Sequence, residues 1–116
     1  MDNRRKHQRV RAAVAAEVEI DVELYEGETR DLSTGGASVA LRAPLRDGME
    51  LSITLFLTED GIESPDEDPL TLQAQVVWLS EPKKGEVLAG LRFLEPSAED
   101  TERLASLLSE LGAAKS

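Results

Sequence analysis

Alternation of apolar and polar residues is the feature that most constrains how this chain can fold. From Val14 to Leu24 every second residue is apolar, and the residues between them are alanine or acidic. A period of two is the geometry of a β-strand with one face in the core and the other in solvent. We therefore predict a long half-buried strand over 14–24, a turn at 25–28, and a returning strand that begins at 29–32.

The same period recurs along most of the chain, separated by turn signals rich in glycine and proline. In the segment over 70–78, Trp78 continues the apolar face, as a tryptophan of the core would. Short strands of this kind favour a small antiparallel barrel or sandwich, because closure leaves no exposed strand edge. The segments concerned are 37–42, 49–58, 70–78 and 86–94.

The period changes near the end of the chain. Ser97 is a good N-cap, and leucines follow it at helical spacing, which predicts a helix over 97–111 ended by Gly112. We expect its leucine stripe to pack on the barrel as a lid, with a partner or dimer surface as the alternative. The stripe consists of Leu104, Leu107, Leu108 and Leu111.

One domain, predominantly β, accounts for the whole chain of 116 residues. It divides into a basic arm over 1–11, a barrel over 12–95 and the helix over 97–111. The absence of cysteine excludes disulfides and thiolate metal sites. No apolar stretch approaches the roughly 20 residues of a membrane span, and the charged start differs from a signal peptide, so a cytoplasmic protein is expected.

The sequence shows no set of residues typical of a catalytic centre. Its single histidine, His7, has no second histidine or carboxylate at metal-binding spacing, and no nucleophile lies in a hydrolase motif. The acidic loop over 58–69 lacks the ligand spacing of a calcium loop. We therefore predict no catalytic residue, no metal and no cofactor.

Charge is distributed unevenly. There are 13 basic residues against 23 acidic ones, a net charge of −10, so binding to long nucleic acids or insertion into membranes is not expected. Nevertheless, five of the basic residues fall within the first eleven positions. Such an arm indicates a localised anion-binding role, with a solvated terminus as the alternative.

Two short motifs fit one anionic ligand. Arg5 and Arg9 are four residues apart, so both guanidinium groups can lie on one side of the chain, where they suit phosphate oxygens and the edge of guanine. Asp31 and Ser33 share one face of an extended chain, and a carboxylate can accept both donors of the guanine Watson–Crick edge. Gly36 would allow the backbone a close approach. Taken alone, the second motif is also typical of a turn that ends a strand.

Together these motifs resemble the PilZ domain family, bacterial receptors for cyclic di-GMP (c-di-GMP), whose pattern is Arg-x-x-x-Arg followed by Asp/Asn-x-Ser-x-x-Gly. The resemblance implies a six-stranded antiparallel β-barrel with a C-terminal helix. It also implies that Arg5 and Arg9 bind phosphate and guanine, that Asp31 and Ser33 bind guanine, and that Gly36 is the close-approach residue.

The resemblance implies two further contacts. Arg4, directly before the first motif, is a further candidate ligand, and an arginine there accompanies a stacked pair of c-di-GMP molecules in the family. Trp78 is similar to an aromatic residue that lies near the ligand in some members, with a core tryptophan as the alternative.

The mechanism expected is that the arm becomes ordered over the ligand and presents a new surface to an unidentified effector protein, while the receptor stays a monomer or weak dimer. Three alternatives remain open. They are an adaptor that does not use the nucleotide, a small RNA- or DNA-binding barrel, and an enzyme that acts on a nucleotide.

Overall fold

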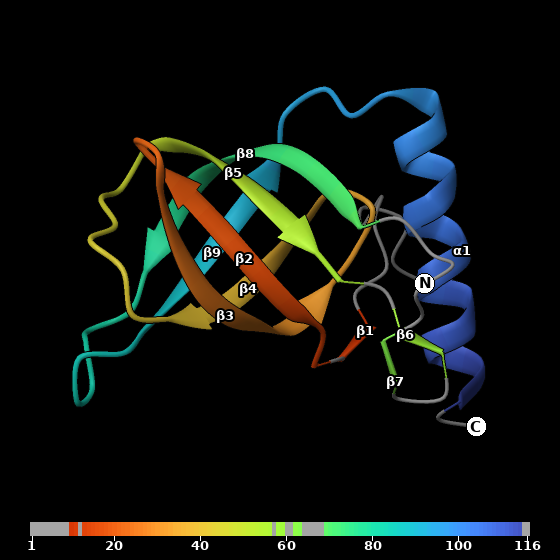
Figure 1. The fold of residues 1–116 in the computed structure, drawn as a ribbon, viewed down its shortest axis with the longest axis horizontal. Coiled ribbons are helices and arrows are strands. Elements are labelled where there is room, and N and C mark those ends of the chain that lie inside the picture. The colour runs from red at the N-terminus through yellow and green to blue at the C-terminus, as the bar shows by residue number, and fades with distance from the viewer. Residues whose placement is uncertain (1–9, 12, 57, 60–61, 64–68, 115–116) are drawn as a thin grey trace, which may run out of the picture.

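The computed structural model describes residues 10–11, 13–56, 58–59, 62–63 and 69–114 (Figure 1). Within these ranges six antiparallel strands pair in the order β3-β2-β5-β8-β9-β4, and β4 pairs back with β3 to close a barrel. The predicted six-stranded barrel is therefore confirmed. The strands are β2 (Ala15–Ile20), β3 (Glu23–Leu32), β4 (Gly36–Leu41), β5 (Glu50–Leu55), β8 (Leu70–Leu79) and β9 (Val87–Phe93).

The core consists of the inward residues of these alternating strands. In β5, for example, Leu51, Ile53 and Leu55 are buried, while Ser52 and Thr54 between them are only partly covered. Burying a side chain of this size contributes roughly 1.5–3 kcal/mol, so the inward faces of six strands supply most of the stabilisation. The side chains that are almost completely buried include Val18, Leu32, Val39, Ile53, Leu55, Leu70 and Val76.

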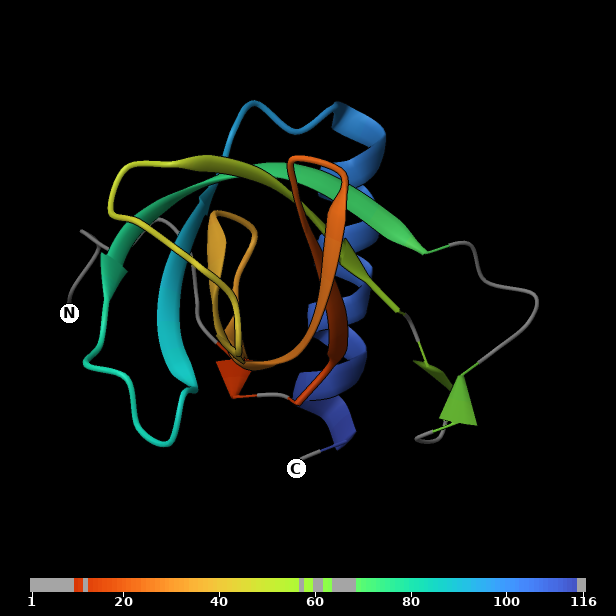
Figure 2. The ribbon, with the colours of Figure 1, turned by 60° about the vertical axis from the view of Figure 1, so that its left-hand side comes forward.

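Helix α1 (Ala98–Ala114) packs beside β8 and β1 (Val10–Arg11), as Figures 1 and 2 show. Its start was predicted correctly, because the backbone N–H of Asp100 donates to the Ser97 hydroxyl over 3.0 Å. Leu104 and Leu107 are buried, as a lid requires. The side chain of Leu111 lies outside the described residues.

The predicted end of the helix was wrong, because Gly112 does not stop it. The helix runs to Ala114. A glycine inside a helix costs only about 1 kcal/mol relative to alanine, and the two alanines that follow it favour helix. Gly112 is therefore an interior residue of α1.

The first hairpin turns earlier than predicted. The long strand expected over 14–24 is divided at Asp21 and Val22, and 25–28 lies within β3. Both turn residues have positive φ, 49° and 67°, as a two-residue type I′ turn requires. Asparagine or glycine usually marks such a turn, whereas a β-branched valine disguises it. Beyond the turn Leu24 pairs with Glu19 and is 58% exposed.

The acidic loop over 58–69 contains a minimal hairpin, formed by β6 (Thr58–Glu59) and β7 (Ile62–Glu63). Residues 60–61 and 64–68 of this loop lie outside the described ranges. Among the residues that the structure does describe, no helix is long and apolar enough to cross a membrane. That part of the chain also holds no group of three metal-ligating side chains.

Candidate ligand-binding site

Two bulges turn side chains outward on neighbouring parts of the barrel wall. The register shifts between Thr29 and Asp31 where β3 pairs with β4, and between Val76 and Trp78 where β8 pairs with β9. Without a bulge, residues two apart would share a face. Instead Thr29 and Val76 are buried, Asp31 is half-buried and Trp78 is 42% exposed. The bulges therefore direct Asp31 and Trp78 out of the barrel, and Trp78 is not a core residue.

The strand register brings these residues into one row. Asp31 pairs with Arg11 on one side and with Ser38 on the other, Ser38 pairs with Gly90, and Gly90 pairs with Trp78. Side chains of directly paired residues lie on the same face of a sheet. The row therefore crosses β1, β3, β4, β9 and β8 on the outer face of the barrel.

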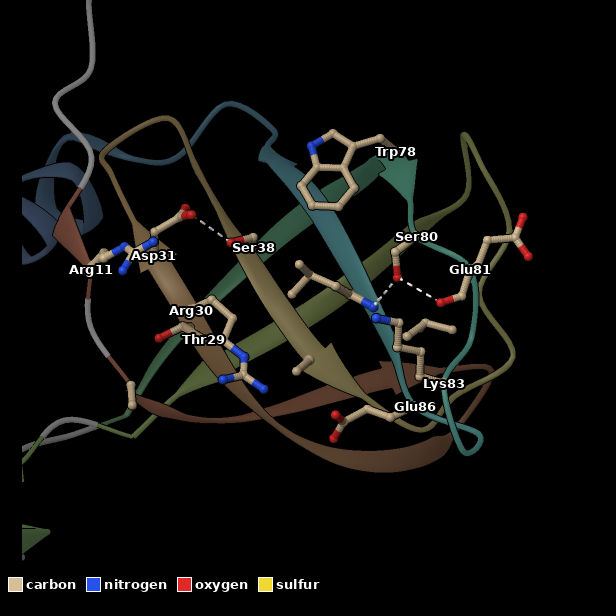
Figure 3. Close-up of a pocket in the computed structure, with 14 residues that line it drawn as sticks. Arg11, Thr29, Arg30, Asp31, Ser38, Trp78, Ser80, Glu81, Lys83 and Glu86 are labelled. Atoms are coloured by element: carbon tan, nitrogen blue, oxygen red, sulfur yellow. Dashed lines mark hydrogen bonds between the residues drawn. The ribbon is translucent and has the colours of Figure 1, made fainter.

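A cavity of about 760 Å³ lies over this row (Figure 3). Trp78 stands at one side of it and Asp31 at another, and Ala40 and Leu88 contribute apolar lining. A cavity that combines an exposed indole with three carboxylates and three cations is suited to a planar ligand that carries both donors and negative charge. The lining residues are Arg11, Ala13, Thr29, Arg30, Asp31, Ser38, Ala40, Trp78, Ser80, Glu81, Lys83, Glu86, Val87 and Leu88.

Ser38 holds the Asp31 carboxylate in position. The Ser38 hydroxyl donates to Oδ2 of Asp31 over 2.8 Å, and the Ser38 side chain is only 3% exposed. A hydrogen bond from a buried donor restricts the rotation of the carboxylate. Ser38 was not among the predicted site residues, because only the register of β3 against β4 reveals that it faces Asp31.

Gly90 makes room for the indole. A Cβ built at Gly90 would overlap the Nε1 edge of the Trp78 ring. Since glycine inside a strand often marks a close approach, Gly90 explains how the ring lies across β9. The face of Trp78 thus forms part of the pocket wall (Figure 3).

Ser33 and Gly36 do not line the pocket. The Ser33 hydroxyl accepts the backbone N–H groups of Gly35 and Gly36, both at 3.1 Å, and donates to the Gly36 carbonyl over 3.2 Å. Its side chain is 2% exposed. A Cβ at Gly36 would overlap the carbonyl oxygen of Leu91, so the close approach at this glycine is to β9. Both residues shape the turn that joins β3 to β4.

Arg4, Arg5 and Arg9 lie outside the described residues. However, Arg9 directly precedes β1, whose Val10 and Arg11 pair with Leu32 and Asp31. This pairing connects the end of the basic arm to the strand that carries Asp31. Arg11, which belongs to the arm but was not predicted as a site residue, lines the cavity.

Comparison with known proteins agrees with this architecture. A family model described as the PilZ domain matches residues 3–110. The PilZ domain of YcgR from Escherichia coli, solved with c-di-GMP, has a TM-score of 0.78 at 22% identity, covering 97% of this chain and 95% of that one. The MrkH–c-di-GMP complex of K. pneumonia has a TM-score of 0.73 at 16% identity, covering 98% and 55%.

The inhibitor of motility MotI/DgrA from Bacillus subtilis has a TM-score of 0.78 at 19% identity, covering 99% of this chain and 54% of its own. This chain therefore spans about half the length of MotI/DgrA. The search of curated proteins found no match. These structural similarities show a shared fold, and the family model covers most of the sequence. The chain therefore belongs to the PilZ domain family.

Proposed function

We propose that this chain is a receptor for c-di-GMP, which binds in the cavity between Asp31 and Trp78. The observation that carries the proposal is the row of paired residues that brings Arg11, Asp31 and Trp78 to one hollow, beside the strand that follows the basic arm. Membership of the PilZ family supports it, as do the c-di-GMP complexes of YcgR and MrkH.

In this proposal the nucleotide base is recognised by the barrel. The Asp31 carboxylate accepts hydrogen bonds from the N1–H and the exocyclic amino group of guanine. The indole of Trp78 stacks on the base, and base–aromatic stacking contributes roughly 1–3 kcal/mol. Ser38 holds the carboxylate, while Ser33 and Gly36 maintain the turn that follows the strand carrying it.

The basic arm supplies the phosphate contacts. Arg5 and Arg9 contact one phosphodiester group and the edge of guanine, and Arg4 contacts a second ligand molecule stacked on the first. Charge-assisted hydrogen bonds of about 1.5–3 kcal/mol each offset the entropy lost when the arm is fixed over the pocket. The closed arm and the barrel together form a surface for an effector protein in the cytoplasm. No bond is made or broken, so the protein acts as a receptor and not as an enzyme.

Calorimetric titration with c-di-GMP tests this function. We expect saturable binding to the unsubstituted protein and a loss of about ten- to a hundredfold for Arg9→Ala and for Asp31→Ala, since each removes charged hydrogen bonds. Arg46→Ala is the matched control, because Arg46 is exposed and does not line the cavity. A ratio near two ligands per chain would support the stacked pair.

Cyclic di-AMP is the ligand control, because adenine lacks the pair of donors that Asp31 accepts. Absence of heat and of any thermal shift at high c-di-GMP concentration would rule out the receptor. That result would favour an adaptor that does not use the nucleotide.

A further inference from the structure

Two cations of the pocket have no partner among the described residues. Arg92 donates to Gln75, Arg42 donates to the Lys84 carbonyl, and Arg11 also has an interaction partner. By contrast, the guanidinium of Arg30 and the ammonium of Lys83 form no hydrogen bond or ion pair with any described side chain. Both nevertheless line the cavity. In a protein with a net charge of −10, unpaired cations in one hollow favour an external anion.

Lys83 belongs to a hairpin with a well-defined backbone. Its N–H donates to the Glu86 carbonyl over 2.8 Å, and the Glu86 N–H donates back over 3.0 Å. Between them Lys84 and Gly85 have φ of 55° and 85°, the left-handed values of a two-residue turn. A further hydrogen bond joins the two ends of the hairpin, because the Leu88 N–H donates to the Ser80 hydroxyl over 3.0 Å.

Arg42 ties this hairpin to the barrel. It directly follows β4, and its Nη1 donates to the Lys84 carbonyl. Gly85 has a φ of 85°, so the turn itself favours glycine at this position. Lys83 lines the pocket, whereas Lys84 beside it does not.

Arg30 lines the cavity from strand β3. It is the extra residue of the bulge between Thr29 and Asp31, and its side chain is exposed. Figure 3 shows Arg30 and Lys83 on the side of the pocket away from Trp78. The carboxylate of Glu81 points away from the pocket centre in the same view. Glu86, which also lines the cavity, is the carboxylate that an anion there would have to face.

We infer that Lys83 and Arg30 form a second cationic wall of the pocket, which contacts a phosphodiester group of the bound nucleotide. The inference rests on the proposed c-di-GMP function. A cyclic dinucleotide carries two phosphodiester groups on opposite sides of its ring, so an arm that clasps one leaves the other over the barrel. The ammonium of Lys83 meets it as a point charge, and Arg30 offers a planar pair of donors.

Substitution of neighbouring lysines separates direct contact from long-range attraction. Lys83→Gln and Lys84→Gln remove the same charge from adjacent positions of one turn, but only Lys83 lines the pocket. In calorimetric titrations with c-di-GMP we expect Lys83→Gln to bind about tenfold more weakly and Lys84→Gln to change affinity less than about twofold. Arg30→Gln should weaken binding about fivefold, and Lys83→Arg should restore most of the affinity.

Three outcomes overturn the inference. Equal losses of affinity for both glutamine variants would mean that the lysines act only through long-range attraction of the ligand. Unchanged affinity for Lys83→Gln would mean that Lys83 does not contact the ligand. Failure of the unsubstituted protein to bind c-di-GMP would overturn the proposed function together with the inference. The first two outcomes overturn the inference alone. Thermal melting checks the fold of each variant, and exposed substitutions of this kind should shift the melting midpoint by only about 3 °C or less.

Discussion

The outer wall of the barrel has two polar faces that differ in how their side chains are paired. On the face formed by β5 and β8, neighbours across the strands bond to each other. The hydroxyl groups of Thr54 and Thr71 are 2.9 Å apart, and the Gln73 amide donates to the Ser52 hydroxyl over 2.7 Å. On the face formed by β3, β4 and β9, a cavity separates Asp31 from Trp78.

The difference shows what regular and interrupted pairing each provide. Regular pairing of β5 with β8 places polar side chains directly opposite one another, so that they can bond across the strands. The bulges beside β4 and β9, with Gly90 between them, leave an uneven surface on which Arg30 and Lys83 bond to no described side chain. An interrupted register thus leaves a cavity where regular pairing closes the polar face.

Gly36→Ala should have the largest effect, because it damages both faces at once. Its Cβ would overlap a backbone carbonyl, that of Leu91, which cannot move without shifting β9. We expect a loss of about 3 kcal/mol in the free energy of unfolding and a melting midpoint lower by about 10 °C. Urea denaturation and thermal melting measure these changes.

Gly48→Ala is the matched control for this prediction. Gly48 has a φ of 88°, yet nothing lies within 4 Å of the position its Cβ would take. Its loss should be limited to backbone strain, about 1 kcal/mol. If the two variants were equally stable, packing against Leu91 would not explain Gly36.

Gly90→Ala should affect the binding face alone. The atoms that its Cβ meets belong to Trp78, an exposed side chain that can swing aside, so stability should fall by less than about 1 kcal/mol. The displaced ring would no longer stack on the base, and c-di-GMP should bind about tenfold more weakly. Because Trp78 is the single tryptophan, a red shift of its fluorescence would report the displacement directly.

Trp78→Ala completes a double-mutant cycle with Gly90→Ala. If the glycine acts only through the ring, the double variant should bind no more weakly than Trp78→Ala alone. Additive losses would mean that Gly90 contacts the ligand by itself, and the indole would then not be the reason for the glycine.

Much of this architecture could be predicted from the sequence, because alternation survives in the strands that pair regularly. The inward residues of β5 and the cap at Ser97 are local patterns. The turn at Val22 could not be predicted, since a β-branched residue seldom adopts a positive φ. This error placed the predicted turn in the middle of β3.

The site was predictable only in part. Asp31 was predicted as a site residue because its motif is local, and it lines the cavity. Trp78 was assigned to the apolar face because a bulge leaves no mark in the alternation of the strand before it. Ser38 and Lys83 could not be found, since neither belongs to a recognisable motif. Ser38 faces Asp31 only through the register of β3 against β4, and Lys83 lines the pocket from a hairpin distant from Asp31 in the sequence.

Two serine-to-alanine substitutions give the smallest effects and compare the faces most directly. Ser38 donates to Asp31 beneath the cavity, whereas Ser52 accepts from Gln73 on the regular face. Ser38→Ala frees the carboxylate to rotate and should weaken c-di-GMP binding about fivefold. The effect is small because water partly replaces the hydrogen bond that Ser38 donates to Asp31.

Ser52→Ala should leave binding unchanged and alter stability by less than about 0.5 kcal/mol, because the exposed Gln73 amide can bond to water instead. Calorimetry and thermal melting of the two variants, measured side by side, decide the matter. Equal binding by both would show that orientation of the Asp31 carboxylate does not limit affinity. A loss for Ser52→Ala would place part of the ligand on the regular face, against the distinction between paired and interrupted surfaces.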